Sequence, residues 1–180
     1  MSQPQEAPFA KLIVRFLFRD HAVQMEALRE LSGRFGPSDC LTEPGPFTFT
    51  DYYDKEMGPA ILRQTCSFDE PVRPETLPDI KLFTNGIENR FRESGKRRVN
   101  IDPGLLTEER FVLATGKNFT HRIYLRDGIY ADLTLIFQKG AYRPLPWTYP
   151  DCRTPEFLRL LLLLRENLRS RRSGNIPKCL

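Results

Sequence analysis

The stretch HRIYLRDGIYADLTLIF, residues 121–137, has branched and aromatic side chains on both sides of Asp127-Gly128. Asp-Gly is a preferred sequence for the two-residue turn of a β-hairpin, in which both turn residues have a positive φ. The stretch therefore predicts two antiparallel strands joined by this turn. Hairpin-linked strands lead to an antiparallel or mixed sheet, so this segment decides the expected fold.

Similar patterns lie on both sides of the hairpin along the chain. Strand-like segments are found at residues 11–18, 47–53, 60–68 and 111–115. Apolar residues three and four positions apart predict helices at residues 21–33, 79–94 and 155–170. We expect the segment 11–18 to be a central strand, and the segment 47–53 to pair with 60–68. Residues 99–105 are expected to be turn-rich, because they contain Pro103 followed by glycine.

Helices and hairpin-linked strands in one chain predict an α+β fold. We expect a single domain that holds a mostly antiparallel or mixed sheet and about three helices. A chain of 180 residues buries roughly 70% of its unfolded surface, which is enough for a substantial core. The domain is expected to span residues 9–172, with a flexible tail at residues 1–8 and a frayed end at residues 173–180.

Composition and cysteine spacing predict a cytoplasmic protein. Apolar residues make up 40% of the chain, and its first eight residues lack the basic and apolar regions of a signal peptide. The longest apolar run, Leu160–Leu164, is far shorter than the ~18 residues of a membrane span. The four cysteines are scattered and form no C-x-x-C pair, so we expect reduced thiols and no zinc site.

The net charge of +4 is concentrated at one end of the chain. Residues 153–180 hold seven basic and two acidic side chains, so residues 1–152 have a net charge of −1. A nucleic-acid binder usually displays a basic stripe on its folded surface. Binding of RNA or DNA through Arg159–Arg172, together with the basic residues of 90–98, is therefore the least favoured of three functional hypotheses.

Polar side chains are unusually frequent in the otherwise strand-like tract between Val99 and Phe137. They are Asn100, Asp102, Lys117, Asn118, His121, Arg122 and Asp132. Burying a polar group without a partner costs roughly 2–7 kcal/mol, so these groups must be exposed, bonded to each other or directed at a ligand. We place the candidate functional site in this tract.

The hairpin supplies a candidate catalytic acid–base pair, His121 and Asp132. With a two-residue turn, Ile123 faces Asp132, and His121 then lies on the same face as that carboxylate and within its reach. A carboxylate beside a histidine holds one tautomer, and the imidazole exchanges protons near neutral pH. A bulge in the hairpin would swap the faces. The alternative is a solvent-exposed strand face on which the histidine has no role.

The residues just before the hairpin suit an anionic ligand. Lys117, Asn118 and Arg122 follow Gly116, and two cations with an amide on a flexible loop can hold a phosphate or carboxylate. Gly116-Lys117 is no P-loop, which needs G-x-x-x-x-G-K-[ST], because residue 111 is Phe and residue 118 is Asn.

A second basic cluster, at residues 90–98, adjoins two of the polar residues of the tract. Its cations complement the C-terminal dipole of the predicted helix 79–94, which is the simpler explanation. Alternatively, Arg98, Asn100 and Asp102 line the same ligand site. The leading hypothesis is thus a protein that binds a small anionic, phosphate-bearing ligand. The sequence leaves open whether the protein is an enzyme.

Three carboxylates are candidate metal ligands. Asp51, Asp54 and Glu88 would hold Mg²⁺ together with a phosphate of the ligand. Carboxylates near turns are also common for local hydrogen bonding alone. Two histidines and scattered cysteines argue against zinc.

The C-terminal part of the chain leads to a rival hypothesis. Five consecutive leucines, Leu160–Leu164, cover most of a helix circumference and predict burial on more than one side. A homodimer would provide such burial, and the protein would then be a non-catalytic interaction protein. Trp147 and Tyr149, in the proline-rich strap before this helix, either clamp the helix onto the sheet, which we favour, or line a pocket for a planar ligand.

Several segments resemble a prokaryotic family catalogued as domain of unknown function 4416. They are TDYYDKEMG (50–58), TNGIE (84–88), VNIDPG (99–104), ATGKNFTHRIYL (114–125), GIYADLTL (128–135) and PWTYPD (146–151). The chain departs from the family at Asp132, where the family pattern tends to have glutamate. The resemblance implies a single-domain cytoplasmic protein of bacteria or archaea, and it implies no particular activity, substrate or cofactor.

Overall fold

In the computed structural model, which describes residues 2–172, the apolar segment KLIVRFLF forms the central strand β1 (Lys11–Phe18). Every residue of this strand except Arg15 is buried. β1 pairs antiparallel with β4 (Leu62–Phe68) on one side and with β5 (Val99–Leu106) on the other. A continuous apolar run is typical of a strand that is covered on both faces, and the prediction of a central strand is confirmed.

The remaining strands extend this sheet on both sides. They are β2 (Ser38–Leu41), β3 (Gly45–Pro46), β6 (Arg110–Thr115), β7 (Arg122–Arg126), β8 (Ile129–Gln138) and β9 (Ala141–Pro144). Within residues 2–172 the nine strands form one open sheet in the order β2-β4-β1-β5-β6-β8-β7, with β3 paired to β4 and β9 to β8. Each pairing is antiparallel, as the hairpin connections predicted.

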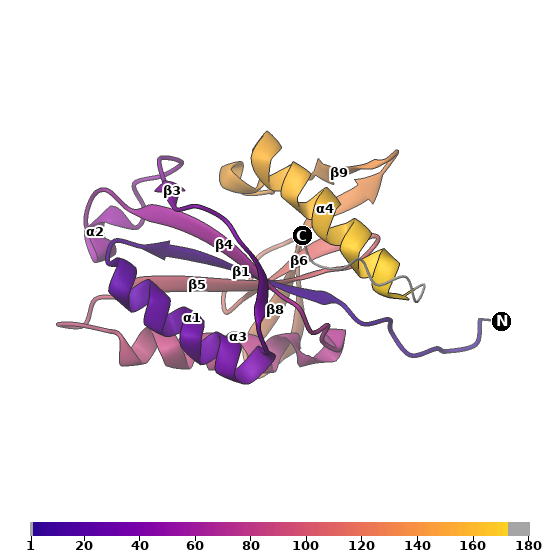
Figure 1. The fold of residues 1–180 in the computed structure, drawn as a ribbon, viewed down its shortest axis with the longest axis horizontal. Helices are drawn as coiled ribbons and strands as arrows, with labels where there is room; N and C mark the ends of the chain where they lie inside the picture. The colour runs from indigo at the N-terminus through magenta and orange to yellow at the C-terminus, as the bar shows by residue number, and fades with distance from the viewer. Residues whose placement is uncertain (1, 173–180) are drawn as a thin grey trace.

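Helices cover both faces of the sheet (Figure 1). α1 (His21–Phe35) and α3 (Leu77–Arg90) lie on one face, and α4 (Pro155–Arg172) lies on the other. The described chain also has three short helices: α2 (Asp54–Met57), η1 (Pro74–Thr76) and η2 (Pro150–Cys152). The single-domain α+β fold is therefore confirmed. All three predicted helices form, and the structure adds the one-turn helix α2.

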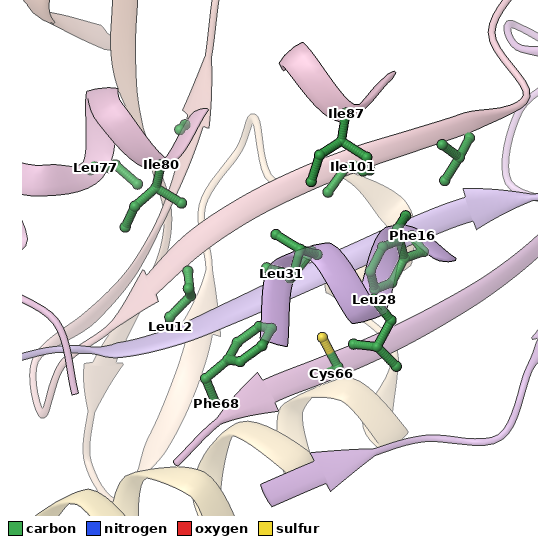
Figure 2. Packing of buried hydrophobic residues seen from close by; sticks show 14 of the residues in the cluster. Leu12, Phe16, Leu28, Leu31, Cys66, Phe68, Leu77, Ile80, Ile87 and Ile101 are labelled. Carbon is green, nitrogen blue, oxygen red and sulfur yellow. The ribbon is translucent and has the colours of Figure 1, made fainter. Parts of the chain in front are cut away.

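The main core lies between the sheet and the helices α1 and α3 (Figure 2). Leu12 and Phe16 of β1 belong to one buried cluster with Leu31 of α1 and Ile87 of α3. The carboxylate of Asp20 caps α1 by accepting a hydrogen bond from a backbone amide of its first turn at 2.9 Å. Local capping and apolar spacing thus explain why the sequence forms α1 where it was predicted.

α4 buries one apolar stripe against the other face of the sheet. Phe157, Leu161, Leu164 and Leu168 are buried at intervals of four, three and four residues, whereas Leu163 is 67% exposed. The stripe shares a cluster with sheet residues such as Phe111. Burial on one side therefore accommodates most of the leucines, and a single exposed leucine is ordinary for a protein surface. The homodimer stays a prediction.

The segment expected to be turn-rich, residues 99–105, is instead the strand β5. The backbone N–H of Ile101 donates to Glu88 at 2.6 Å and its carbonyl accepts from Lys81 at 2.9 Å, so α3 side chains bond the edge that faces away from β1. Pro103 faces the same way two residues later, where its missing N–H takes no bond from the β1 ladder. The pairing of β5 with β6 accordingly begins only at Gly104.

Gly104 is required for the close approach of the two strands. A Cβ at this position would lie 2.8 Å from the ring of Phe111 and from the backbone oxygen of Val112. Only glycine fits here without displacing the backbone. The Pro-Gly sequence that suggested a turn therefore marks the point in β5 where pairing with β6 begins and the two strands pack closely.

Three further segments differ from the sequence prediction. Residues 47–53 form no strand and do not pair with β4, whose partners are β1, β2 and β3. The sequence predicted neither β2 nor β9 as a strand. These strands are short and lack an alternating pattern, so their pairing depends on the neighbouring strand rather than on their own sequence.

Residues 2–9 have no regular secondary structure. The next residue, Ala10, forms an isolated antiparallel β-bridge with Val72. The frayed end predicted for residues 173–180 lies outside the described residues, as does Met1. Within residues 2–172, no helix combines the length and the hydropathy that are needed to span a membrane.

Candidate functional site

The hairpin of β7 and β8 has the predicted turn but a different register. Asp127 and Gly128 both have a positive φ, of 54° and 75°, as a two-residue hairpin turn requires. An irregularity between Tyr124 and Arg126 shifts the pairing by one residue, so that Arg122, and not Ile123, lies opposite Asp132. The predicted register is therefore wrong.

The predicted pair of His121 and Asp132 nevertheless forms. A turn closed by the bond from the Arg122 amide to the Phe119 carbonyl, at 3.0 Å, precedes β7 and places His121 outside the regular strand. Nε2 of His121 lies 3.2 Å from Oδ2 of Asp132, and Nε of Arg122 donates to the same oxygen at 2.9 Å. The three side chains are 9%, 3% and 9% exposed. One buried carboxylate is thus shared by an arginine and a histidine.

The ring of His121 is held on its face as well as at Nε2. It stacks on Trp147, with centroids 4.8 Å apart and planes 12° apart, and the edge of Phe119 lies 5.5 Å away. The indole N–H of Trp147 donates to the backbone oxygen of Leu133 at 2.8 Å. When Nε2–H donates to Asp132, the neutral ring keeps its lone pair on Nδ1, which is then the atom that can accept a proton.

Each nitrogen of the Arg122 guanidinium bonds to a protein group. Its Nε donates to Asp132, its Nη1 to the backbone oxygen of Lys117 at 2.9 Å, and its Nη2 to the hydroxyl of Tyr149 at 2.6 Å. All three guanidinium nitrogens therefore hold the site together. This geometry shows Arg122 positioning Asp132 and Tyr149, and its role as a ligand-binding cation stays a prediction.

Lys117 has a neutral partner instead. Its Nζ donates to the hydroxyl of Tyr52 at 3.0 Å and lies 5.0 Å from the centre of that ring. This hydrogen bond and the positive charge of Lys117 lower the pKa of the Tyr52 phenol from its ordinary value. Asn118 is exposed in the same loop. Lys117 is thus an exposed cation beside the buried cluster, and no carboxylate neutralises it within the described contacts.

Asn100 and Asp102 lie on β5, which is separated from β8 in the sheet by β6. Nδ2 of Asn100 donates to Asp102 at 2.7 Å, and Nζ of Lys81 lies 3.4 Å from the other oxygen of that carboxylate. The side chain of Asp102 is 36% exposed. Burial raises the pKa of Tyr149, and the negative charges of Asp132 and Asp102 raise it further. Both carboxylates therefore act on Tyr149, whose hydroxyl bonds to Arg122 of the cluster.

The segment that carries Tyr52 and α2 is joined to the residues before β5 by ion pairs of Glu56 with Arg97 and, at 3.8 Å, with Arg92. Arg97 donates from Nε and Nη2 to the two oxygens of Glu56, at 2.8 and 2.7 Å, and from Nη1 to Asn100 at 2.6 Å. The paired bonds of a guanidinium and a carboxylate fix orientation as well as distance. This pair of Arg97 and Glu56, here called the latch, fixes the segment whose Tyr52 bonds to Lys117.

Replacing Glu56 by glutamine is expected to lower the free energy of unfolding by about 1 kcal/mol at neutral pH. The hydrogen bonds from Arg97 lower the pKa of Glu56. A carboxyl with a lowered folded pKa stabilises above its unfolded pKa, about 4.3, and this stabilisation is lost as the pH falls through the folded pKa. The difference between wild type and Glu56→Gln in urea unfolding should therefore shrink below about pH 4. Glu26→Gln, at an exposed position of α1, is the control; a difference that stays constant with pH would contradict the latch.

Two sets of predicted site residues are not brought to the cluster. Arg98 pairs with Asp20 at 2.5 Å and with Glu93 at 3.6 Å. Glu88 is buried on α3, where burial raises its pKa, and its carboxylate bonds to Ile101. Asp51 and Asp54, the other candidate metal ligands, are exposed. Among residues 2–172, no group of three or more His, Cys, Asp or Glu side chains could hold a metal ion.

The sequence did not predict the ion pair that holds the proline-rich strap, residues 144–155, against the sheet. Arg15 of β1 bonds to Asp151 of η2, and its Nη1 lies 2.8 Å from Sγ of Cys152. The signal was present, since Arg15 is the only charged residue after Lys11 in an otherwise apolar strand. Its partner is 136 residues away and could not be found from spacing. Trp147 and Tyr149 in the same strap contact His121 and Arg122, and the pocket for a planar ligand stays a prediction.

A hollow of about 380 Å³ lies apart from this cluster. Side chains of α1, η1 and α3 line it, among them Phe35, Arg73 and Phe83, and no predicted site residue does. Arg73 is paired with Glu6 there. The hollow has no cluster of buried polar groups, so we assign the candidate site by the shared carboxylate and not by this hollow.

The comparisons with known proteins agree with the shared segments noted in the sequence. A family model described as Domain of unknown function (DUF4416) matches residues 8–168, which is most of the chain. No curated protein and no solved structure matches the chain. The matched range contains every residue of the cluster described above, so any functional argument has to start from that geometry.

Proposed function

We propose, for a chain that belongs to the family described as Domain of unknown function (DUF4416), that it binds a small anionic, phosphate-bearing ligand through Lys117 and His121. The observation that carries the proposal is the carboxylate of Asp132, which is shared by His121 and Arg122. The single negative charge of Asp132 is thus in contact with both an arginine and a histidine.

The charge balance of this cluster favours an anion. When His121 is protonated, the trio with Arg122 and Asp132 has a net charge of +1, and Lys117 adds a second positive charge whose partner, Tyr52, is a neutral hydroxyl. Charge-assisted hydrogen bonds from such groups are the usual way to hold phosphate. The proposed ligand is therefore bound by Nζ of Lys117 and Nδ1 of His121.

A small ligand fits the rest of the surface better than a nucleic acid does. Basic residues of the two clusters that suggested RNA or DNA binding are paired within the protein, as Arg90 is with Glu30 and Arg171 with Asp69. A polymer needs a row of unpaired cations along its backbone. Residues 1–152, which include Lys117 and His121, have a net charge of −1.

Turnover of the ligand would use the same geometry. Asp132 holds Nε2–H of His121, so Nδ1 accepts or returns a proton on the reacting group. Arg122 keeps the carboxylate and Tyr149 in place. The proposal of binding stands independently of this chemistry, because binding needs only the charges and their positions.

Isothermal titration calorimetry with ribose 5-phosphate tests the proposal. Lys117→Ala is expected to weaken binding about tenfold, the usual effect of one charge-assisted bond. His121→Asn, which removes the proposed donor Nδ1 and cannot become positively charged, is likewise expected to weaken binding at constant pH. Arg143→Ala removes an exposed cation from β9 and serves as the matched control. The proposal fails if the wild type binds neither this compound nor inorganic phosphate, or if Lys117→Ala binds as tightly as the control.

A further inference from the structure

Four aromatic side chains around the cluster are unusually exposed. Tyr52, Phe119, Trp147 and Tyr149, here called the aromatic rim, retain between 39% and 62% of their accessible surface. They come from three separate segments of the chain. Large aromatic rings dominate cores and interfaces, so several exposed rings around one polar cluster indicate a surface that is covered by a ligand or a partner.

The rim is held in place by the polar ends of its rings. The hydroxyl of Tyr52 accepts a hydrogen bond from Lys117, that of Tyr149 accepts one from Arg122, and the indole N–H of Trp147 donates to a backbone oxygen. Three of the four rings are thus anchored at one edge, and the fourth, Phe119, packs on His121 at 5.5 Å, while much of their apolar surface remains exposed. Rings fixed in this way make stacking surfaces that cost little ordering on binding.

Resting on the function proposed above, we propose that the phosphate-bearing ligand is a nucleotide. Its base stacks on the exposed rings of Trp147 and Phe119, and its phosphate is bound by Lys117. Both rings contact His121, one by stacking at 4.8 Å and the other at its edge at 5.5 Å. Stacking surface and phosphate-binding groups are therefore joined in one cluster.

Exposed aromatic rings beside a single exposed lysine favour a nucleotide over a sugar phosphate and over a nucleic acid. A sugar phosphate would satisfy the cations but would leave the flat apolar rings uncovered by any planar group. A single-stranded nucleic acid would stack on the rings, but its backbone requires a positively charged groove. The net charge of −1 over residues 1–152 supplies no such groove.

The fluorescence of Trp147 reports on this site directly, because it is the only tryptophan of the sequence. Titrations with adenosine 5′-monophosphate and ribose 5-phosphate differ only in the base. We expect the nucleotide to quench the fluorescence and to bind about tenfold more tightly, as stacking of one base on an aromatic side chain typically provides.

Two variants separate stacking from folding. Phe119→Ala and Trp147→Ala, the latter followed by calorimetry, should each weaken binding of the nucleotide about tenfold more than binding of ribose 5-phosphate, which reports any effect through His121. Phe119 is 62% exposed, so its removal leaves the core intact. Tyr124→Ala is the matched control, since Tyr124 is also exposed but packs on Tyr130 outside the rim.

The outcomes distinguish this inference from the function on which it rests. Equal affinities for the nucleotide and ribose 5-phosphate would overturn the nucleotide assignment and leave the phosphate site standing. Failure of both compounds to bind would overturn the phosphate site as well. Rim variants that bind the nucleotide normally but lose self-association in sedimentation would show that the rim docks a second copy of the chain, and would also overturn the assignment.

Discussion

Replacing Arg15 by methionine is expected to lower the free energy of unfolding by about 3–5 kcal/mol. Arg15 and Asp151 form an ion pair in which each side chain is only 12% exposed, and the guanidinium also lies 4.8 Å from the centre of the Phe157 ring. Methionine fills a similar volume but leaves Asp151 as a buried, unpaired charge. Thermal unfolding followed by circular dichroism should show a decrease in Tm of about 2–4 °C for each kcal/mol.

A second substitution shows whether the unpaired charge is the cause. Adding Asp151→Asn to Arg15→Met removes that charge, so the double variant should be more stable than Arg15→Met alone. Arg63→Met is the control, because Arg63 makes only a 3.5 Å bond to the Asp151 backbone and lies over Phe49, and its loss should cost under about 1 kcal/mol. Equal losses in Arg15→Met and Arg63→Met would contradict the role assigned to the buried pair.

Replacing Asp132 by alanine should also lower the free energy of unfolding by about 3–5 kcal/mol. The substitution leaves Arg122, whose side chain is 9% exposed, without its carboxylate, and it removes the acceptor of Nε2 of His121. Urea unfolding measures the loss of stability. Two-bond ¹⁵N–¹H spectra measure the second effect, since the Nε2–H tautomer of His121 should no longer be favoured.

The conservative substitution gives the matched test. Asp132→Glu keeps the negative charge with one more methylene, so it should retain the His121 tautomer and recover most of the stability, apart from about 1–3 kcal/mol for the added volume. His21, the other histidine of the chain, lies outside the cluster and provides a reference signal in the same spectra. A stability loss below about 1 kcal/mol in Asp132→Ala, with the His121 tautomer unchanged, would show that this carboxylate does not organise the site.

Several parts of the fold were determined by local sequence alone. The run KLIVRFLF predicted a covered strand, the spacing of apolar residues predicted α1, α3 and α4, and Asp127-Gly128 predicted the hairpin turn. Each of these signals lies within a few turns or residues of the element it specifies. The polar tract from Asn100 to Asp132 likewise located the candidate site, because its composition is expensive to bury without partners.

Other features were decided only by the tertiary structure. Residues 99–105 form a strand because β1 pairs with one edge and the side chains of Lys81 and Glu88 bond the other, which the local sequence does not show. The shifted register of the hairpin is likewise invisible in an Asp-Gly turn.

The site shows the same division. Its charged residues were visible in the sequence, but the rings of Trp147 and Tyr149 reach them from a distant strap, and that strap is fastened to β1 by the pair of Arg15 and Asp151. Spacing rules describe neighbours along a helix or a hairpin. The contacts of Arg122 with Tyr149, 27 residues apart, and of Arg15 with Asp151, 136 residues apart, depend instead on how the strap and the sheet pack, so only the tertiary structure shows them.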